Sequence, residues 1–256
     1  MKQGKKRMFI YIFNLYFVLI MLYISRILLQ KQIICNRRYG KSTLEIDVIS
    51  KFFIILAFCS MFLISGLRYN VGTDYYEYKS LFDNIANKSI TSFQFKLEPV
   101  FILISKFIGI FSKNSVWMFI ITSFFIAYFI FKTVIKSCKL YELGIFLFIS
   151  FGFYTSSLNI IRQWMAVGIL LYAYTFLKDN KNKIFFKYLL LACCCHYSAL
   201  VVLTVYLFIR KPRKNITRIF IMLMGVVLFS ITNYIINILK IISLNVSFLN
   251  KYYKYL

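Results

Sequence analysis

The sequence predicts an all-α fold, a polytopic transmembrane helical bundle, from three observations. Of the 256 residues, 61% are hydrophobic and only 16% are charged, whereas soluble domains are about 45–50% apolar and about 25% charged. The apolar residues gather in runs, and a helix of about 20 apolar residues can cross a bilayer. Nine Gly and two Pro are too few for a collagen-like or low-complexity chain. A soluble globular protein is therefore excluded.

Seven apolar runs define the expected elements, at residues 8–29, 48–67, 97–112, 116–135, 143–177, 184–209 and 219–242. The first follows a basic start typical of a signal peptide, but it is too long and lacks a small-residue cleavage site, so we expect an uncleaved span. Run 143–177 is too long for one crossing, and its polar centre at 155–159 favours a turn. We expect about eight crossings, one or more of them broken or re-entrant.

The run 184–209 leaves two arrangements open, because the loops on both sides of it are strongly basic. Basic loops stay in the cytoplasm, and a single crossing would place one of them outside. One arrangement is a broken or re-entrant helix pair that turns near His196. The other is a long tilted helix with a tolerated basic outer loop.

The net charge of +24, from 32 Lys and Arg against 8 Asp and Glu, comes from short clusters between the apolar runs. These clusters lie at residues 2–7, 31–41, 178–187 and 210–218. This pattern is typical of cytoplasmic loops that meet anionic lipids, so we expect membrane lipids as partners. A nucleic-acid-binding protein would gather these charges on one face, and we expect no nucleic acid partner.

The segment after Arg68 differs from the rest because its acidic and basic residues balance up to Glu98. A neutral, tyrosine-rich loop in a basic protein is the best candidate for an external face. We therefore expect one transmembrane domain over residues 1–256 with an external functional loop at 68–96. The chain stops at Leu256 without a closing tail, which leads us to expect a C-terminal truncation.

Within this loop, Arg68, Gly72 and Asp74 form the most informative pattern. The arginine fork can bind a diphosphate through paired hydrogen bonds, the glycine can adopt a positive φ, and the carboxylate can act as a base on a hydroxyl. Tyr75 and Tyr78 offer an apolar face and a polar tip to sugar rings. The alternative is a turn held by an Arg–Asp pair, with tyrosines in the aromatic belt.

Two further charged residues lie at or within apolar runs. Glu98 precedes Pro99 at the start of a run, where a carboxylate ordinarily caps the helix, and a catalytic role requires it to face the same cavity as Arg68. Arg162 lies inside the run 143–177, and its insertion costs roughly 2.5–3.5 kcal/mol. We expect Arg162 to face Asp74, Glu98 or a bound anion.

His196 is the single histidine of the chain and follows three cysteines, Cys193 to Cys195. Consecutive helical residues point about 100° apart, so these four cannot converge on one ion. We therefore expect neither a metal nor another cofactor, and six unpaired cysteines act as small apolar residues. General acid–base work, or a hydrogen bond to phosphate, is the expected role of His196.

Four separated motifs resemble the EpsG family of Wzy-like exopolysaccharide polymerases. They are Gly66-Leu67-Arg68 with Val71-Gly72-Thr73-Asp74-Tyr75 and Tyr78, then Glu98-Pro99, then Ile161-Arg162-Gln163 with Ala166, then His196-Tyr197-Ser198-Ala199-Leu200. The resemblance implies a multi-pass protein of the bacterial inner membrane that joins polyprenyl-diphosphate-linked oligosaccharide repeat units, alongside other polysaccharide-assembly proteins. Its members generally continue past the position where this chain stops.

The resemblance also implies roles for residues within these motifs. The catalytic candidates are Asp74, Glu98 and His196. The candidates for binding diphosphate or sugar are Arg68, Gly72, Thr73, Tyr75, Tyr78, Arg162, Gln163 and Ser198. In the implied reaction, a hydroxyl of one repeat unit attacks the anomeric carbon of a growing glycan and displaces polyprenyl diphosphate at the outer face.

Three other functions compete with polymerisation. A transporter or flippase of an anionic lipid-linked sugar also uses broken helices and membrane arginines. An acyltransferase with His196 as its base lacks an acid near that histidine in sequence. A purely structural subunit explains the spans but leaves Arg162 without a role.

Overall fold

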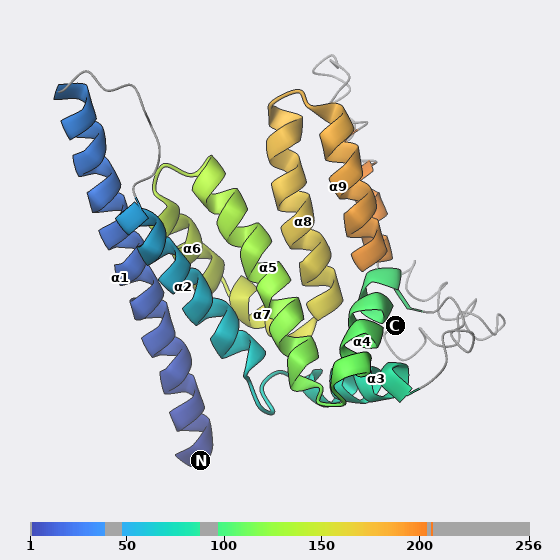
Figure 1. Cartoon of the computed structure of the whole chain (residues 1–256). Helices are drawn as coiled ribbons and strands as arrows, with labels where there is room; N and C mark the ends of the chain where they lie inside the picture. The colour runs from blue at the N-terminus through green and yellow to red at the C-terminus, as the bar shows by residue number, and fades with distance from the viewer. Residues whose placement is uncertain (1, 39–47, 88–96, 204–205, 207–256) are drawn as a thin grey trace, which may run out of the picture. The chain divides into compact units, whose positions relative to one another are not determined.

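The computed structural model describes residues 2–38, 48–87, 97–203 and 206, and the expected run 219–242 lies outside them. Helices are the only regular secondary structure in this part of the chain (Figure 1). They are α1 (Lys2–Arg38), α2 (Val48–Gly66), α3 (Tyr75–Asn87), α4 (Pro99–Phe111), α5 (Val116–Ser137), α6 (Tyr141–Ser150), α7 (Phe153–Asn159), α8 (Ile161–Lys178), α9 (Asn182–Cys195) and the 3₁₀ helix η2 (Tyr197–Leu200). The all-α prediction is confirmed.

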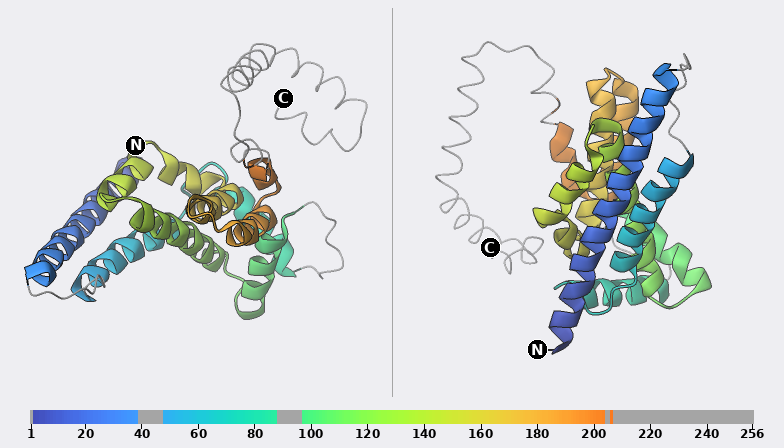
Figure 2. Two further views of the ribbon diagram at one scale, coloured as in Figure 1. Left: turned by 90° about the horizontal axis from the view of Figure 1, so that it is seen from above. Right: turned by 90° about the vertical axis from the view of Figure 1, so that its left-hand side faces the viewer.

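The long helices pack in the order α1, α2, α5, α8 and α9 (Figure 2). Helices α2 and α5 approach closely at Gly66, because a Cβ atom added there would lie 2.7 Å from the Cα atom of Ile120. All these helices belong to one compact unit, Met1–Val202. Aromatic rings fill much of its interior, with Phe82, Phe101, Phe119 and Phe185 fully buried, and such rings contribute strongly to core packing.

By length and composition, three of the described helices can cross a membrane: Phe9–Gln32 within α1, then α2 and α5. The pair α6 and α7 adds a fourth span if it is counted as one, with a bend of 57°. The bend lies at Gly152, whose φ of 78° is left-handed, a conformation that glycine commonly provides just after a helix ends.

The expected turn in the run 143–177 is present, but its position differs from the prediction. The polar segment 155–159 is helical and belongs to α7, and the chain breaks on either side of it, at Gly152 and at Ile160. Ile160 has φ −92° and ψ 63°, outside the helical region. The break at Ile160 sets the start of α8 and therefore the direction of the Arg162 side chain.

The two ends of the bundle hold different parts of the chain, which we call the loop end and the basic end. The loop end holds residues 67–75 and the start of α5, while the basic end holds the second half of α1, the end of α5 and the turn between α8 and α9 (Figure 1). The described residues of the basic cluster 31–41, at the end of α1, and the basic cluster 178–187, around the turn between α8 and α9, thus lie at the same end of the bundle. The cluster 2–7 does not, because α1 is continuous and its residues Ile10 and Tyr11 lie beside Leu67 at the loop end.

The loop expected at 68–96 contains an additional helix. Helix α3 buries Tyr75, Tyr78, Phe82 and Ile85, and this spacing of three and four residues is the signature of an amphipathic helix. Helix α4 packs against it, since Gly109 lies against Ala86 and Lys113 donates to the Ala86 carbonyl at 3.0 Å. Residues 88–96 of the expected loop lie outside the described part.

Candidate functional site

Glu98 begins α4, but its side chain does not cap that helix. The residue is extended, with φ −69° and ψ 137°, Pro99 occupies the first turn, and the carboxylate makes no cap hydrogen bond. The prediction that Glu98 is primarily a cap is therefore wrong. The carboxylate turns instead toward residues from two other helices.

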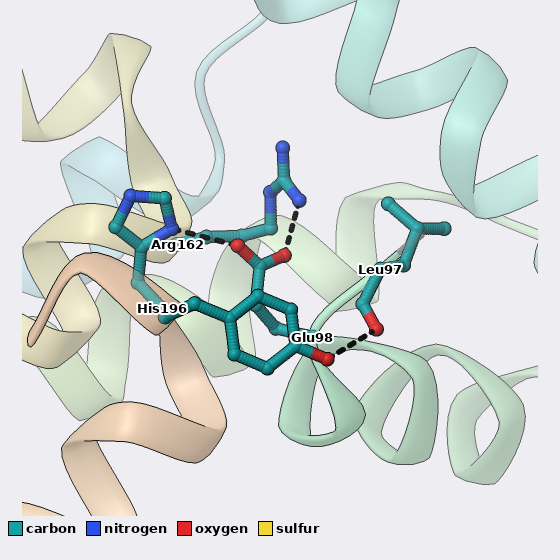
Figure 3. Close-up of polar contacts among 5 residues, drawn as sticks. Leu97, Glu98, Arg162 and His196 are labelled. Carbon is teal, nitrogen blue, oxygen red and sulfur yellow. Dashed lines mark hydrogen bonds and ion pairs between the residues drawn. The ribbon is translucent and has the colours of Figure 1, made fainter. Parts of the chain in front are cut away.

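The Glu98 carboxylate lies between Arg162 and His196 (Figure 3). Its Oε2 atom accepts a hydrogen bond from Nη1 of Arg162, and its Oε1 atom is 2.7 Å from Nδ1 of His196. Glu98 is only 4% exposed, whereas about a quarter of each partner side chain reaches the surface. A buried carboxylate needs such charged or hydrogen-bonding partners to remain ionised.

Arg162 occupies the first turn of α8, directly after the break at Ile160. Its guanidinium carbon lies 5.9 Å from the centre of the Tyr78 ring and 6.0 Å from that of Phe101. Only one terminal nitrogen bonds Glu98, and the other points away from the carboxylate (Figure 3). Its buried Nε atom has no hydrogen-bond partner among the described residues. Of the two side chains expected as partners of Arg162, Asp74 and Glu98, the structure shows Glu98.

His196 lies where α9 ends. Its backbone is extended, with φ −159° and ψ 122°, and the chain continues as the 3₁₀ helix η2. This break favours the broken arrangement of the run 184–209 over one continuous tilted helix. The next residue forms a parallel link, since Tyr197 donates from its hydroxyl to the Leu97 carbonyl at 3.3 Å. Residues 97–98 and 196–197 are therefore joined twice.

Arg68 is buried and ties two helix ends together. Its terminal nitrogens donate to the carbonyls of Ser65, near the end of α2, and Leu158, near the end of α7, each at 2.9 Å. A cation is favourable at both ends because they carry unpaired carbonyls. The guanidinium also stacks on Phe119, 4.6 Å from the ring centre. Burial lowers the pKa of Arg68 to about 10, so it remains positively charged at neutral pH.

The loop after Arg68 rests on the same break in the chain. Gly72 has φ 101°, as its type suggested, and a Cβ atom there would lie 2.6 Å from Oδ1 of Asn159. That same Oδ1 accepts the backbone N–H of Thr73 at 2.8 Å. Asn159 belongs to the polar segment 155–159 but was not a predicted site residue, because its contact with the loop depends on how the loop packs. Gly72 and Thr73 therefore shape and anchor the loop.

Asp74 does not join the Glu98 cluster. Its Oδ1 atom accepts the hydroxyl of Thr73 at 2.8 Å, and among the described ion pairs it pairs with neither Arg68 nor Arg162. The alternative of an Arg68–Asp74 pair holding the turn is therefore not what the structure contains. Asp74 instead precedes α3, where its carbonyl accepts the N–H of Tyr78 at 3.0 Å.

The predicted sugar-binding tyrosines are packed inside the protein. Tyr75 is 3% exposed and stacks on Phe119 at 4.8 Å between ring centres, and Tyr78 is 7% exposed. Burial raises the pKa of the Tyr75 hydroxyl. The rings of Tyr69 and Tyr76, which contact that of Tyr75 edge to face, are exposed. Neither Tyr75 nor Tyr78 offers a free face to a sugar, contrary to expectation.

Six of the predicted site residues fall into two groups. Glu98, Arg162 and His196 form the charged cluster, whereas Arg68, Gly72 and Thr73 hold the loop to the end of α7. Gln163 and Ser198 are exposed near Arg162 and His196 in sequence. No group of three or more metal-ligating His, Cys, Asp or Glu side chains gathers within the described ranges.

A cavity of about 340 Å³ lies between α1 and α2, and Arg68 forms part of its lining. Its lining includes Ile10, Tyr11, Leu67, Arg68 and Tyr69. A pocket that is largely apolar with one cation can accept an amphipathic ligand. The lining of this cavity does not include Glu98, Arg162 or His196, so it is not the shared cavity of Arg68 and Glu98 that the sequence led us to expect.

These features define the class, a multi-pass helical membrane protein with a charged site held between broken helices. The model of the EpsG family matches residues 51–256, more than half of the chain, and this match includes every residue of the site. The chain belongs to the EpsG family and is an exopolysaccharide-related membrane protein. No curated protein and no solved structure matches it.

Proposed function

We propose that this chain is a polysaccharide polymerase of the bacterial cell membrane. It joins polyprenyl-diphosphate-linked oligosaccharide repeat units into exopolysaccharide or capsule, with the loop end facing outward. The observation that carries this proposal is the Glu98 carboxylate, which holds a histidine on one oxygen and an arginine on the other. Glycosyl transfer needs a base for the attacking hydroxyl and positive charge for the leaving diphosphate, and this cluster contains both.

His196 is the base in this proposal. With Nδ1–H donating to Glu98, the second ring nitrogen, Nε2, is left unprotonated and able to accept a proton. As the hydroxyl oxygen of the acceptor repeat unit bonds to the anomeric carbon of the donor glycan, its proton passes to Nε2. Glu98 then stabilises the positive imidazole without touching the substrate, in the manner of the carboxylate in hydrolase triads.

Arg162 binds the leaving group. As the bond from the anomeric carbon to the diphosphate oxygen breaks, the electron pair stays on the departing polyprenyl diphosphate. The terminal nitrogen of Arg162 that points away from Glu98 provides a hydrogen bond and positive charge where this negative charge develops (Figure 3). This region holds two arginines, Arg68 and Arg162, against one buried acid, Glu98. The charge of the buried Arg68 therefore adds to the positive field around the leaving diphosphate.

Arg68 and Asp74 have supporting roles in this scheme. Arg68 positions the break before α8 through its bond to the Leu158 carbonyl, and thereby positions Arg162. Asp74 lies on the anchored loop and remains a candidate for contacting the acceptor sugar, together with Gln163, Ser198 and the accessible tyrosines Tyr69 and Tyr76. We rank His196 above Asp74 as the base, because only His196 has an acid partner and a neighbouring cation.

A flippase for the same lipid-linked sugar is the competing proposal. The 57° bend between α6 and α7 and the break at His196 favour it, since broken helices carry substrate sites in many transporters. The two functions differ in which intermediate accumulates when the protein fails. A failed polymerase leaves single lipid-linked units on the outer face, and a failed flippase leaves them on the inner face.

The experiment places Arg162→Gln in the cell that makes the polymer and extracts its lipid-linked glycans. A periodate reagent that cannot cross the membrane reports which face they occupy. We expect single repeat units at the outer face. Units confined to the inner face would favour the flippase, and polymer of normal length would contradict a role for Arg162 in either function.

The chain itself offers a matched control. Arg26 and Glu142 form a second arginine–glutamate pair, 2.5 Å apart and similarly shielded, at the basic end. The control variant Arg26→Gln makes the same chemical change without a neighbouring histidine. Cells that carry this control variant are expected to make polymer of normal length when compared at equal amounts of inserted protein.

A further inference from the structure

At the basic end, far along α5 from the proposed active site, two lysines lie among aromatic rings. Lys132 and Lys136 are one helical turn apart on α5, and Tyr172 and Phe176 face them from α8. Tyr188 of α9 stacks on Phe176, with 5.5 Å between ring centres. We call Lys132, Lys136, Tyr128, Tyr172 and Phe176 the lysine–tyrosine cluster.

Lys132 lies within a membrane-crossing helix, and no acidic side chain of the described residues forms an ion pair with it. Its Nζ atom donates to the hydroxyl of Tyr128 at 2.8 Å. The same atom lies 4.6 Å from the ring centre of Tyr172 and 4.9 Å from that of Tyr128. The rings hold the ammonium in place through cation–π attraction but leave its charge unneutralised.

Lys136 is only partly neutralised. Its Nζ atom donates to the hydroxyl of Thr175 at 3.0 Å and lies 3.6 Å from a carboxylate oxygen of Asp179, which is half exposed. Two like charges one turn apart on a helix repel each other. One half-exposed carboxylate for two lysines leaves an excess positive charge near the end of α5.

We propose that the lysine–tyrosine cluster binds the phosphate of an anionic phospholipid in the membrane leaflet at the basic end. Basic pockets between transmembrane helices recognise such head groups on the cytoplasmic side. The phosphate accepts hydrogen bonds from both ammonium groups, and the hydroxyl of Tyr128, 38% exposed, lies within reach of the same site. This site is separate from the proposed polymerase centre and does not depend on it.

The test uses the purified full-length chain in POPC vesicles, with and without POPG. The wild-type chain is expected to gain about 2–4 °C in its unfolding midpoint from POPG. The double variant Lys132→Gln with Lys136→Gln is expected to lose that gain. A purely structural role of the lysines would lower the midpoint equally in both vesicles, so the difference between vesicles reports lipid binding alone.

The matched control is Lys51→Gln with Lys139→Gln. It removes the same charge from two exposed lysines, one in α2 and one directly after α5, that lie outside the lysine–tyrosine cluster and outside the four basic clusters of the sequence. This control is expected to keep the gain from POPG. Lys136→Gln alone, at a half-exposed position, is expected to lose part of it should the double variant fold poorly. The proposal is overturned if POPG leaves the wild type unchanged, if the cluster variants keep the full gain, or if inorganic phosphate in POPC vesicles produces the same gain.

Discussion

Glu98 and His196 are 98 residues apart in the chain, yet their side chains meet at 2.7 Å, from Oε1 to Nδ1. Glu98 directly precedes α4 and His196 directly follows α9, and both have extended backbones. The two side chains therefore meet where α4 begins and α9 ends. The one histidine of the sequence is thereby given an acid partner. Arg162 holds the opposite oxygen of the same carboxylate.

The Glu98–Arg162 pair contributes to stability as well as to the proposed chemistry. Arg162→Gln leaves the buried Glu98 carboxylate without its cation, which costs about 1–3 kcal/mol and lowers the amount of inserted protein. Adding Glu98→Gln removes the unpaired charge and is expected to restore the amount but not the polymer. Immunoblots of membranes, compared with polymer length, measure the two effects. Polymer of normal length in the double variant would contradict the assignment.

Arg68→Lys gives a pH-dependent prediction. Because burial lowers the pKa of Arg68 to about 10, its folded pKa lies below its unfolded value. Its contribution to stability therefore rises with pH above about 10 and is constant near neutrality. A lysine has an ordinary pKa of about 10.4, and the same burial would lower it from there toward neutrality. Polymer formation by Arg68→Lys should thus fall as the pH rises from 7 to 9.

Wild-type chain is expected to show no such fall, since its arginine stays charged throughout that range. Polymer formation by wild type and by Arg68→Lys is measured in membranes buffered at several pH values. Lys51→Gln, which removes a positive charge from the surface, is the control. Parallel pH profiles for Arg68→Lys and wild type would show that the charge at this position has no part in polymer formation.

Gly72→Ala tests the docking of the loop. The new Cβ atom would lie 2.6 Å from Oδ1 of Asn159, and the backbone has φ 101°, which together cost about 1–2 kcal/mol or more. The loop should become more sensitive to an external protease, and the polymer should shorten. Gly152→Ala is the control, since its φ is also positive, 78°, but its nearest neighbouring atom is 3.7 Å away. Equal effects of the two substitutions would exclude a specific role for the contact with Asn159.

Hydropathy predicted the spans better than the connections between them. The expected runs 48–67 and 116–135 correspond closely to α2 and α5, because each is a single apolar helix. Run 143–177 was harder, since its breaks depend on Gly152 and Ile160 rather than on the polar residues between them. Helix α3 was missed although its apolar spacing was visible, because its many polar residues give it the composition of a loop.

The sequence predicted which residues belong to the site but not which of them contact one another. Glu98, Arg162 and His196 stood out because charged or titratable residues are costly within apolar runs. Their association depends on how α4, α8 and α9 pack, and contacts across 64 and 98 residues leave no trace in local composition. For the same reason Asn159 was overlooked, and Tyr75 and Tyr78 were expected at the surface although α3 turns both rings inward.

The most direct test of the proposed site is a double-mutant cycle on Glu98 and His196. Polymer formation per inserted molecule is measured for Glu98→Gln, His196→Gln and the double variant, with Arg26→Gln as the control for a disrupted ion pair. If the two residues act as one unit, each single variant loses about 10²-fold or more, and the double variant loses no more than the worse single one. Losses that multiply, or full activity in His196→Gln, would contradict a shared catalytic role.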